Sequence, residues 1–175
     1  WVEEFSLAKG LCGKSRPGHF RGVTTVVAKL FNATLPDTAV FGKKDYQQAQ
    51  VLIRMVRDLN FPVRIFLHEI VREEDGLALS SRNRYLSAEE RRNALSIRRS
   101  LMSAKSAVLN GRKNISSIRK SIADGISSAG GRLDYVEIVD AGNLEPVKRL
   151  SGKILIAVAA FFGRTRLIDN IDFKI

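Results

Sequence analysis

Apolar residues in the first seventy positions recur at two different spacings. One helical face is predicted by residues at i, i+3, i+4 and i+7, which are Val23, Val26, Val27 and Leu30. Residues 38–41 and 63–67 are short, largely apolar runs rich in β-branched and aromatic side chains, which is typical of strands. Between these runs lies a second helical stripe, formed by Ala49, Leu52, Ile53, Val56 and Leu59. A strand, a helix and a strand in this order imply a right-handed crossover between parallel strands, which is half of a doubly wound sheet.

After residue 86 the pattern changes to two long helices followed by strands. Ser87 and Glu90 are spaced as in a capping box, in which each side chain bonds the backbone N–H of the other at a helix start. Apolar positions then keep one helical face to about Leu109, and a second stripe follows between residues 115 and 126. Strands are predicted at residues 133–139 and 154–162. Helices followed by strands indicate a small α+β domain.

The predicted fold class is therefore α/β, with half of a doubly wound sheet in residues 1–70 and a smaller α+β domain in residues 71–175. We also expect residues 1–11 to be the end of a helix that stops at Gly10, and residues 13–19 to form a loop. No apolar run approaches the roughly 20 residues that a membrane helix needs, so we expect no membrane partner.

The chain carries 29 lysine and arginine residues against 18 acidic residues, a formal net charge of +11. Such an excess favours either a nucleic-acid-binding module or an anionic small-molecule site on a protein with solvated helix faces. The basic residues between positions 91 and 120 come in pairs without aromatic residues among them, which favours the second hypothesis. A single cysteine and two histidines leave too few ligands for a zinc site, and we predict no metal site in the chain. The lone Cys12 also fits a reducing compartment.

Residues 42–45, Gly-Lys-Lys-Asp, follow a predicted parallel strand and open a helix. Ligands of open α/β sheets bind at this edge. Gly42 lets the backbone approach a ligand closely, and Lys43 and Lys44 favour a polyphosphate. Asp45 either caps the helix or holds a ribose hydroxyl. The sequence therefore predicts a nucleotide-phosphate site here, which makes residues 1–70 a partial nucleotide-binding domain.

Residues 71–83 have neither a helical nor a strand period, and their centre carries the turn signal Asp-Gly at positions 75–76. Two hydroxyls, a guanidinium and an amide close the segment, and these groups suit phosphate oxygens. They belong to Ser80, Ser81, Arg82 and Asn83. We interpret the segment as the boundary between the two domains and as one wall of an active site. Phosphoryl or nucleotidyl transfer would need mainly positioning and charge stabilisation from such groups.

Four segments carry a resemblance to a known family. They are Arg-Pro-Gly-His-Phe at residues 16–20, Phe-Gly-Lys-Lys-Asp-Tyr-Gln-Gln at 41–48, all of 71–86, and Thr-Arg-Leu-Ile-Asp-Asn at 165–170. In order and spacing these segments resemble pantothenate synthetases. The resemblance implies the second half of a Rossmann-like nucleotidylyl-transferase domain followed by a lid domain. It also implies a cytoplasmic, homodimeric ligase that uses ATP and Mg²⁺ to condense pantoate with β-alanine through pantoyl adenylate, releasing AMP and pyrophosphate.

The resemblance further implies roles for single residues. The ATP-binding residues would be Gly42, Lys43, Lys44, Asp45, Val71, Leu79, Ser80, Ser81 and Arg82. The catalytic residues among them would be Lys44, Ser80, Ser81 and Arg82. Lys44 would lie near the α-phosphate, Asp45 near the ribose and the Val71 backbone near adenine, while Gln48 would bind pantoate. Residues 80–82 would correspond to the Lys-Met-Ser-Lys-Ser loop of related nucleotidylyl transferases, and residues 16–19 to a mobile flap.

The sequence also departs from the family pattern. The family's His-x-Gly-His signature does not occur in this chain, and Lys43 stands where many relatives have glutamate. We therefore expect the carboxyl-terminal part of such an enzyme, one that makes little or no pantothenate by itself. Two alternatives stay open. A basic nucleic-acid-binding module would bind unrelated DNA or RNA in a salt-sensitive manner, and a non-catalytic structural fragment would oligomerise through an open sheet edge.

Overall fold

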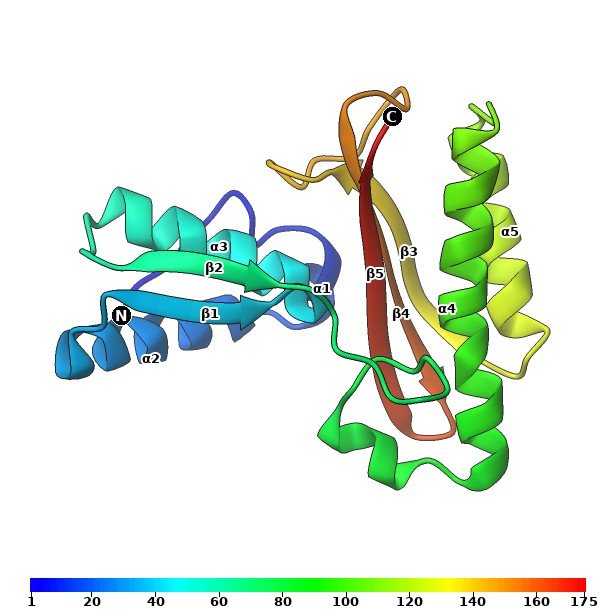
Figure 1. Ribbon diagram of the computed structural model, residues 1–175, viewed down its shortest axis with the longest axis horizontal. Coiled ribbons are helices and arrows are strands. Elements are labelled where there is room, and N and C mark those ends of the chain that lie inside the picture. The colour runs from blue at the N-terminus through cyan, green and yellow to red at the C-terminus, as the bar shows by residue number, and fades with distance from the viewer. The chain divides into compact units, whose positions relative to one another are not determined.

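The computed structural model describes residues 1–175, which form two compact units, Trp1–Ile70 and Val71–Ile175 (Figure 1). Each unit has its own sheet and its own apolar cluster. Both units combine helices with a sheet, which confirms the predicted α/β class.

The first unit is built around two parallel strands, β1 (Thr38–Gly42) and β2 (Arg64–His68). The helix α3 (Tyr46–Asp58) connects them, which confirms the predicted strand–helix–strand arrangement. The helix α2 (His19–Thr34) precedes β1, and both helices share one apolar cluster with one face of the sheet. The strands pair in register up to Gly42 and its partner in β2, so their carboxyl ends meet at the same edge.

The other face of this two-stranded sheet is exposed. Val40 and Phe66, which lie opposite each other in β1 and β2, are 64% and 53% exposed. Parallel sheets usually have both faces covered, whereas this face of the first unit's sheet is an exposed apolar surface.

The amino-terminal segment differs from the prediction, because no helix precedes Leu11. The carboxylate of Glu4 instead accepts hydrogen bonds from consecutive backbone N–H groups, at distances of 3.0, 2.7 and 3.1 Å, those of Ser6, Leu7 and Ala8. The predicted loop contains the short helix α1 (Leu11–Ser15). A Cβ atom at Gly13 would lie 1.7 Å from the carbonyl oxygen of Ala8, so only glycine permits this close crossing.

The buried face of α2 is rotated relative to the prediction. Val26 and Leu30 are 61% and 55% exposed, although Val23 and Val27 do pack at the margin of the cluster. The side chains that are buried are Phe20, Thr24, Ala28 and Phe31. Aromatic rings bury more apolar surface than valine or leucine, so the two phenylalanines set the face that points inward.

The stripe predicted for α3 is correct at its centre and wrong at its end. Ala49 and Leu52 are buried, but Leu59 is 50% exposed because it follows the last helical residue. Val51 and Met55 are buried as well, so the apolar face is wider than predicted.

The second unit is an antiparallel sheet with two helices on one of its faces (Figure 1). Its strands are β3 (Arg132–Asp140), β4 (Lys153–Phe162) and β5 (Thr165–Lys174), in that spatial order. Its helices are α4 (Ala88–Leu109) and α5 (Ile115–Ser127). The capping box is confirmed, since Ser87 Oγ accepts from the Glu90 N–H at 3.1 Å and the Glu90 carboxylate accepts from the Ser87 N–H at 2.8 Å.

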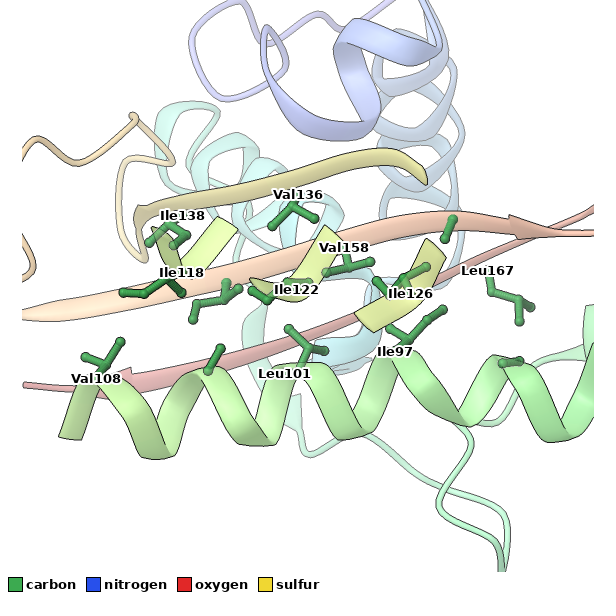
Figure 2. Packing of buried hydrophobic residues seen from close by; sticks show 14 of the residues in the cluster. Ile97, Leu101, Val108, Ile118, Ile122, Ile126, Val136, Ile138, Val158 and Leu167 are labelled. Carbon is green, nitrogen blue, oxygen red and sulfur yellow. The ribbon is translucent and has the colours of Figure 1, made fainter. Parts of the chain in front are cut away.

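The core of this unit forms where the two helical stripes meet the sheet. Figure 2 shows Leu101 of α4, Ile122 of α5 and Val158 of β4 among the side chains that converge there. All three are less than 2% exposed. Both predicted helical stripes are confirmed, whereas the strand β5 was not predicted, because its buried positions include the polar Asp169 and Asn170.

Candidate functional site

Residues 42–45 turn from β1 into α3 at the edge where both parallel strands end. Gly42 is the last residue of β1, a single 3₁₀ turn η1 (Lys43–Asp45) follows, and α3 begins at Tyr46. The space where a side chain would stand at Gly42 holds no other atom within 4 Å, so its backbone is open to a ligand. This is the position at which open α/β sheets bind their ligands.

The two lysines of this turn each lie beside a carboxylate. Lys43 forms an ion pair with Glu69, the residue after β2, and so links the ends of the two strands. The Nζ atom of Lys44 lies 3.5 Å from Asp45 Oδ2, which is long for a hydrogen bond. The four groups carry no net formal charge together, so the attraction for a polyphosphate is weaker than two lysines alone would suggest.

The polar side chains of Asp45, Gln47 and Gln48 differ in how far the fold itself uses them. Asp45 precedes α3, but its carboxylate makes no capping hydrogen bond, so capping is not its role. Gln47 is buried and structural, because its Nε2 donates to the carbonyls of Leu7 and Gly10, both at 2.8 Å. Gln48 is half-buried and makes no side-chain hydrogen bond within the chain, so its amide is available to a ligand.

Residues 71–79 form a small hairpin at the start of the second unit. The backbone N–H of Leu79 donates to the Val71 carbonyl at 2.9 Å, and that of Glu73 donates to the Leu77 carbonyl at 2.8 Å. Gly76 closes the turn with φ +91°, a conformation that glycine adopts without strain. Val71 and Leu79 are 53% and 54% exposed, so both residues can contact a ligand.

Residues 80–82, here called the serine–arginine turn, lead from this hairpin into the short helix η2 (Ser81–Tyr85). Ser80 Oγ accepts a hydrogen bond from the Arg82 N–H at 3.3 Å, and this leaves the Ser80 O–H proton for another acceptor. Ser81 and Arg82 are exposed, and their side chains make no hydrogen bond or ion pair within the chain. The turn therefore presents two hydroxyl donors and a guanidinium to a ligand.

A polar network lies directly behind the serine–arginine turn. The Nδ2 atom of Asn83 donates to the Glu73 carboxylate and, at 3.0 Å, to the Ala78 carbonyl. Arg91 of α4 contacts both Glu73 and Asp75 at 2.7 Å. The hydrogen bond from Arg91, helped by Asn83, lowers the pKa of the Glu73 carboxyl below its ordinary value. The backbone N–H of Leu77, at 3.1 Å, and then Arg91 lower the pKa of the Asp75 carboxyl.

These shifts predict how the network responds to pH. A carboxyl whose pKa is lowered in the fold stabilises the fold above its unfolded pKa and loses this contribution as pH falls through the folded value. We expect both carboxylates to stabilise the hairpin at pH 7 and to lose this contribution only as pH falls below their ordinary pKa values, which are 4.5 for Glu73 and 3.8 for Asp75. Carboxyl titration by NMR measures both groups.

Replacing Arg91 by methionine tests which groups lower the pKa values of Glu73 and Asp75. The pKa of Glu73 should rise more than that of Asp75, because the first cause is Arg91 for Glu73 but the Leu77 N–H for Asp75. Equal rises, or no rise at Glu73, would contradict it.

Two residues that support the serine–arginine turn, Glu73 and Arg91, were not predicted from the sequence, because no spacing rule connects them with the turn. The prediction that the Asn83 amide suits phosphate oxygens is wrong, because Asn83 is buried and its Nδ2 is bonded to Glu73 and to the Ala78 carbonyl. Arg72 and Asp169 are also missed: they form a two-pronged ion pair at 2.8 and 2.9 Å, although 97 positions separate them. The only signal in the sequence was the acidic Asp169 within a stretch of alternating apolar residues, because an acidic side chain that is buried in a strand needs a partner.

The predicted flap, residues 16–19, is a short connection between α1 and α2. An Nη atom of Arg16 lies 2.9 Å from Nε2 of His19, the first residue of α2. Of the remaining predicted site residues, those from Gly42 to Gln48 lie in the first unit, and Val71 with Leu79, Ser80, Ser81 and Arg82 lie in the second.

No group of three or more His, Cys, Asp or Glu residues is arranged to hold a metal ion. No helix combines the length and the apolar character that crossing a membrane requires.

Comparison with known proteins connects both groups of residues to one family. The family model of pantoate-beta-alanine ligase matches residues 1–172. The chain is 53% identical over 175 residues to the pantoate–beta-alanine ligase of Lotus japonicus, a match that covers 100% of this chain and 57% of that protein.

Two solved structures extend the comparison to the fold. Pantothenate synthetase from Thermus thermophilus matches with a TM-score of 0.92 and 42% identity, over 98% of this chain and 62% of that one. Pantoate-beta-alanine ligase from Francisella tularensis, complexed with beta-gamma ATP and beta-alanine, matches with a TM-score of 0.70 and 31% identity, over 98% and 57%. The chain thus spans less than two thirds of each of these relatives.

Proposed function

Because this chain belongs to the pantoate–beta-alanine ligase family, we propose that the whole enzyme joins pantoate to β-alanine at the expense of ATP. A pantoate carboxylate oxygen attacks the α-phosphorus of ATP, and pyrophosphate leaves. The amine of β-alanine then attacks the acyl carbon of pantoyl adenylate, AMP leaves with the carboxylate oxygen, and the amine loses a proton. No side chain of the enzyme becomes covalently attached.

The observation that carries this proposal is the serine–arginine turn, with an exposed guanidinium and two hydroxyls held over a rigid network. Arg82 supplies a charge and Ser80 and Ser81 supply donors to phosphate oxygens, where negative charge grows during transfer. Lys44 acts in the same way at the α-phosphate. Such groups stabilise a transition state by position and charge, without forming bonds.

The remaining assignments concern recognition. Gly42 and Lys43 contact ATP, Asp45 holds a ribose hydroxyl, and the adenine lies against the backbone of Val71 and the side chain of Leu79. Gln48 binds pantoate, which its uncommitted amide supports.

Magnesium enters this proposal with the nucleotide. The chain itself contains no cluster of metal-ligating side chains. A Mg²⁺ ion bound with ATP would neutralise part of the triphosphate charge. We also infer a cytoplasmic homodimer from the family resemblance. Light scattering of the whole enzyme measures the oligomeric state, and cell fractionation the location.

An isotope experiment tests the order of bond changes. Pantoate labelled with ¹⁸O in its carboxylate should give AMP that carries one labelled oxygen, because this oxygen bridges the acyl carbon and the phosphorus in the adenylate. Mass spectrometry of AMP and pyrophosphate measures the label. Label in pyrophosphate, or in neither product, would contradict an adenylate, and omission of pantoate should abolish pyrophosphate release.

A further inference from the structure

The hairpin that carries the serine–arginine turn is fastened at two places to the rest of its unit. Arg72 forms the two-pronged ion pair with Asp169 of β5, and its Nη1 also donates to the Gly76 carbonyl at 3.1 Å. Arg91 of α4 contacts Glu73 and Asp75 on the other side of the hairpin turn. The hairpin is therefore fixed to a strand and to a helix, and the serine–arginine turn follows directly from it.

Asn83 fastens the serine–arginine turn itself to this hairpin. It is 6% exposed, and its Nδ2 lies between two acceptors, the Glu73 carboxylate and the Ala78 carbonyl. This placement fixes the orientation of the amide, because in the flipped orientation Oδ1 would face the two acceptor oxygens in place of Nδ2. The Oδ1 atom is buried without a hydrogen-bond partner. A buried acceptor without a partner destabilises the fold, so any stabilisation from Asn83 comes from the two hydrogen bonds that its Nδ2 donates.

Glu73 is the centre of the arrangement. One carboxylate oxygen accepts from Asn83 and the other accepts from Arg91 at 2.7 Å. The position of the turn is thereby linked to the position of α4 through a single side chain.

We propose that Asn83 and Arg91 are positioning residues, which hold the serine–arginine turn in the conformation that receives the ATP phosphates. Neither side chain points at the phosphates: Asn83 is buried, and Arg91 is occupied by two carboxylates. They act through Glu73 and the backbone of residues 78–83. This inference rests on the proposed function, in which the serine–arginine turn binds ATP.

The geometry distinguishes the two arginines. Arg91 uses a single nitrogen, Nη2, for both carboxylates, so the one nitrogen of a lysine can replace it. Arg72 uses two nitrogens on the two oxygens of Asp169, which a lysine cannot reproduce. R91K should therefore retain the network that R91M loses.

The first experiment measures the conformation of the turn in the 175-residue chain. N83D has the same shape as the native side chain but places an oxygen against the Glu73 carboxylate and the Ala78 carbonyl. Hydrogen exchange at the backbone amides of residues 82 and 83 should become about tenfold faster in N83D and R91M, and should stay unchanged in R91K. N110D, which changes charge equally at an exposed helix end, serves as the matched control.

The second experiment measures ATP use by the whole enzyme. N83D should raise the KM for ATP about tenfold and leave the KM for β-alanine unchanged, which general damage to the fold would not do. Unchanged exchange in N83D overturns the inference, and so does faster exchange with an unchanged KM for ATP. If N83D fails to fold, the same two measurements are compared between R91M and R91K. R91M should show the faster exchange and the higher KM for ATP, and equal values for the two variants overturn the inference. The unsubstituted enzyme is tested for pantothenate synthesis in the same series, and only its failure there counts against the proposed function.

Discussion

Replacement of Lys44 by alanine in the whole enzyme is expected to slow formation of the adenylate by about 10²- to 10³-fold. The reason is electrostatic: in the proposed function Lys44 is the cation beside the α-phosphate, and its removal leaves the charge that grows on the phosphate oxygens without a preorganised partner. The fold should not change, because the Lys44 side chain lies in a one-turn 3₁₀ segment outside the apolar cluster of the first unit. Pantoate-dependent release of pyrophosphate, followed over a single turnover, measures this step.

Two further lysines control this experiment. Lys120→Ala removes an equal charge from an exposed pair on α5 and should leave the rate unchanged. Lys43→Ala should reduce the rate less than Lys44→Ala, because the Lys43 ammonium is paired with Glu69, whereas we assign Lys44 to the α-phosphate. Near-normal turnover of Lys44→Ala, or equal losses from both neighbouring lysines, would refute the role assigned to Lys44.

Elements whose side chains pack by a regular period could be predicted from the sequence. The stripe of α4 and that of α5 are buried at the predicted positions, since a helix with one apolar face has only one way to cover the sheet. The buried face of α2 was wrong, because two phenylalanines outside the chosen stripe bury more surface than its valines. The strand β5 was missed because Asp169 is buried, and its charged partner Arg72, which makes that burial tolerable, lies far away in the chain.

The candidate site shows the same limit. The residue types that suit a phosphate could be recognised at residues 42–45 and 80–82, because charge and hydroxyl groups are local properties. The network behind them could not be recognised, since the contact of Asn83 with Glu73 depends on the hairpin turn between them and that of Arg91 depends on where α4 packs. Sequence thus indicates which groups meet a ligand, whereas the fold determines what holds them in place.

Replacement of Leu101 by alanine is expected to lower the free energy of unfolding of the second unit by about 2–5 kcal/mol. Leu101 is fully buried on α4, where it faces α5 and the sheet (Figure 2), so the change removes apolar contacts and leaves a cavity in a core that cannot collapse to fill it. Its neighbour Met102 is 43% exposed, and Met102→Ala should change the stability by less than about 0.5 kcal/mol.

Hydrogen exchange at buried amides of β4 reports unfolding of this unit separately from the first, which matters because two compact units need not unfold in one step. A loss from Leu101→Ala no larger than that from Met102→Ala would mean that the packing of α4 and α5 on the sheet does not hold this unit together.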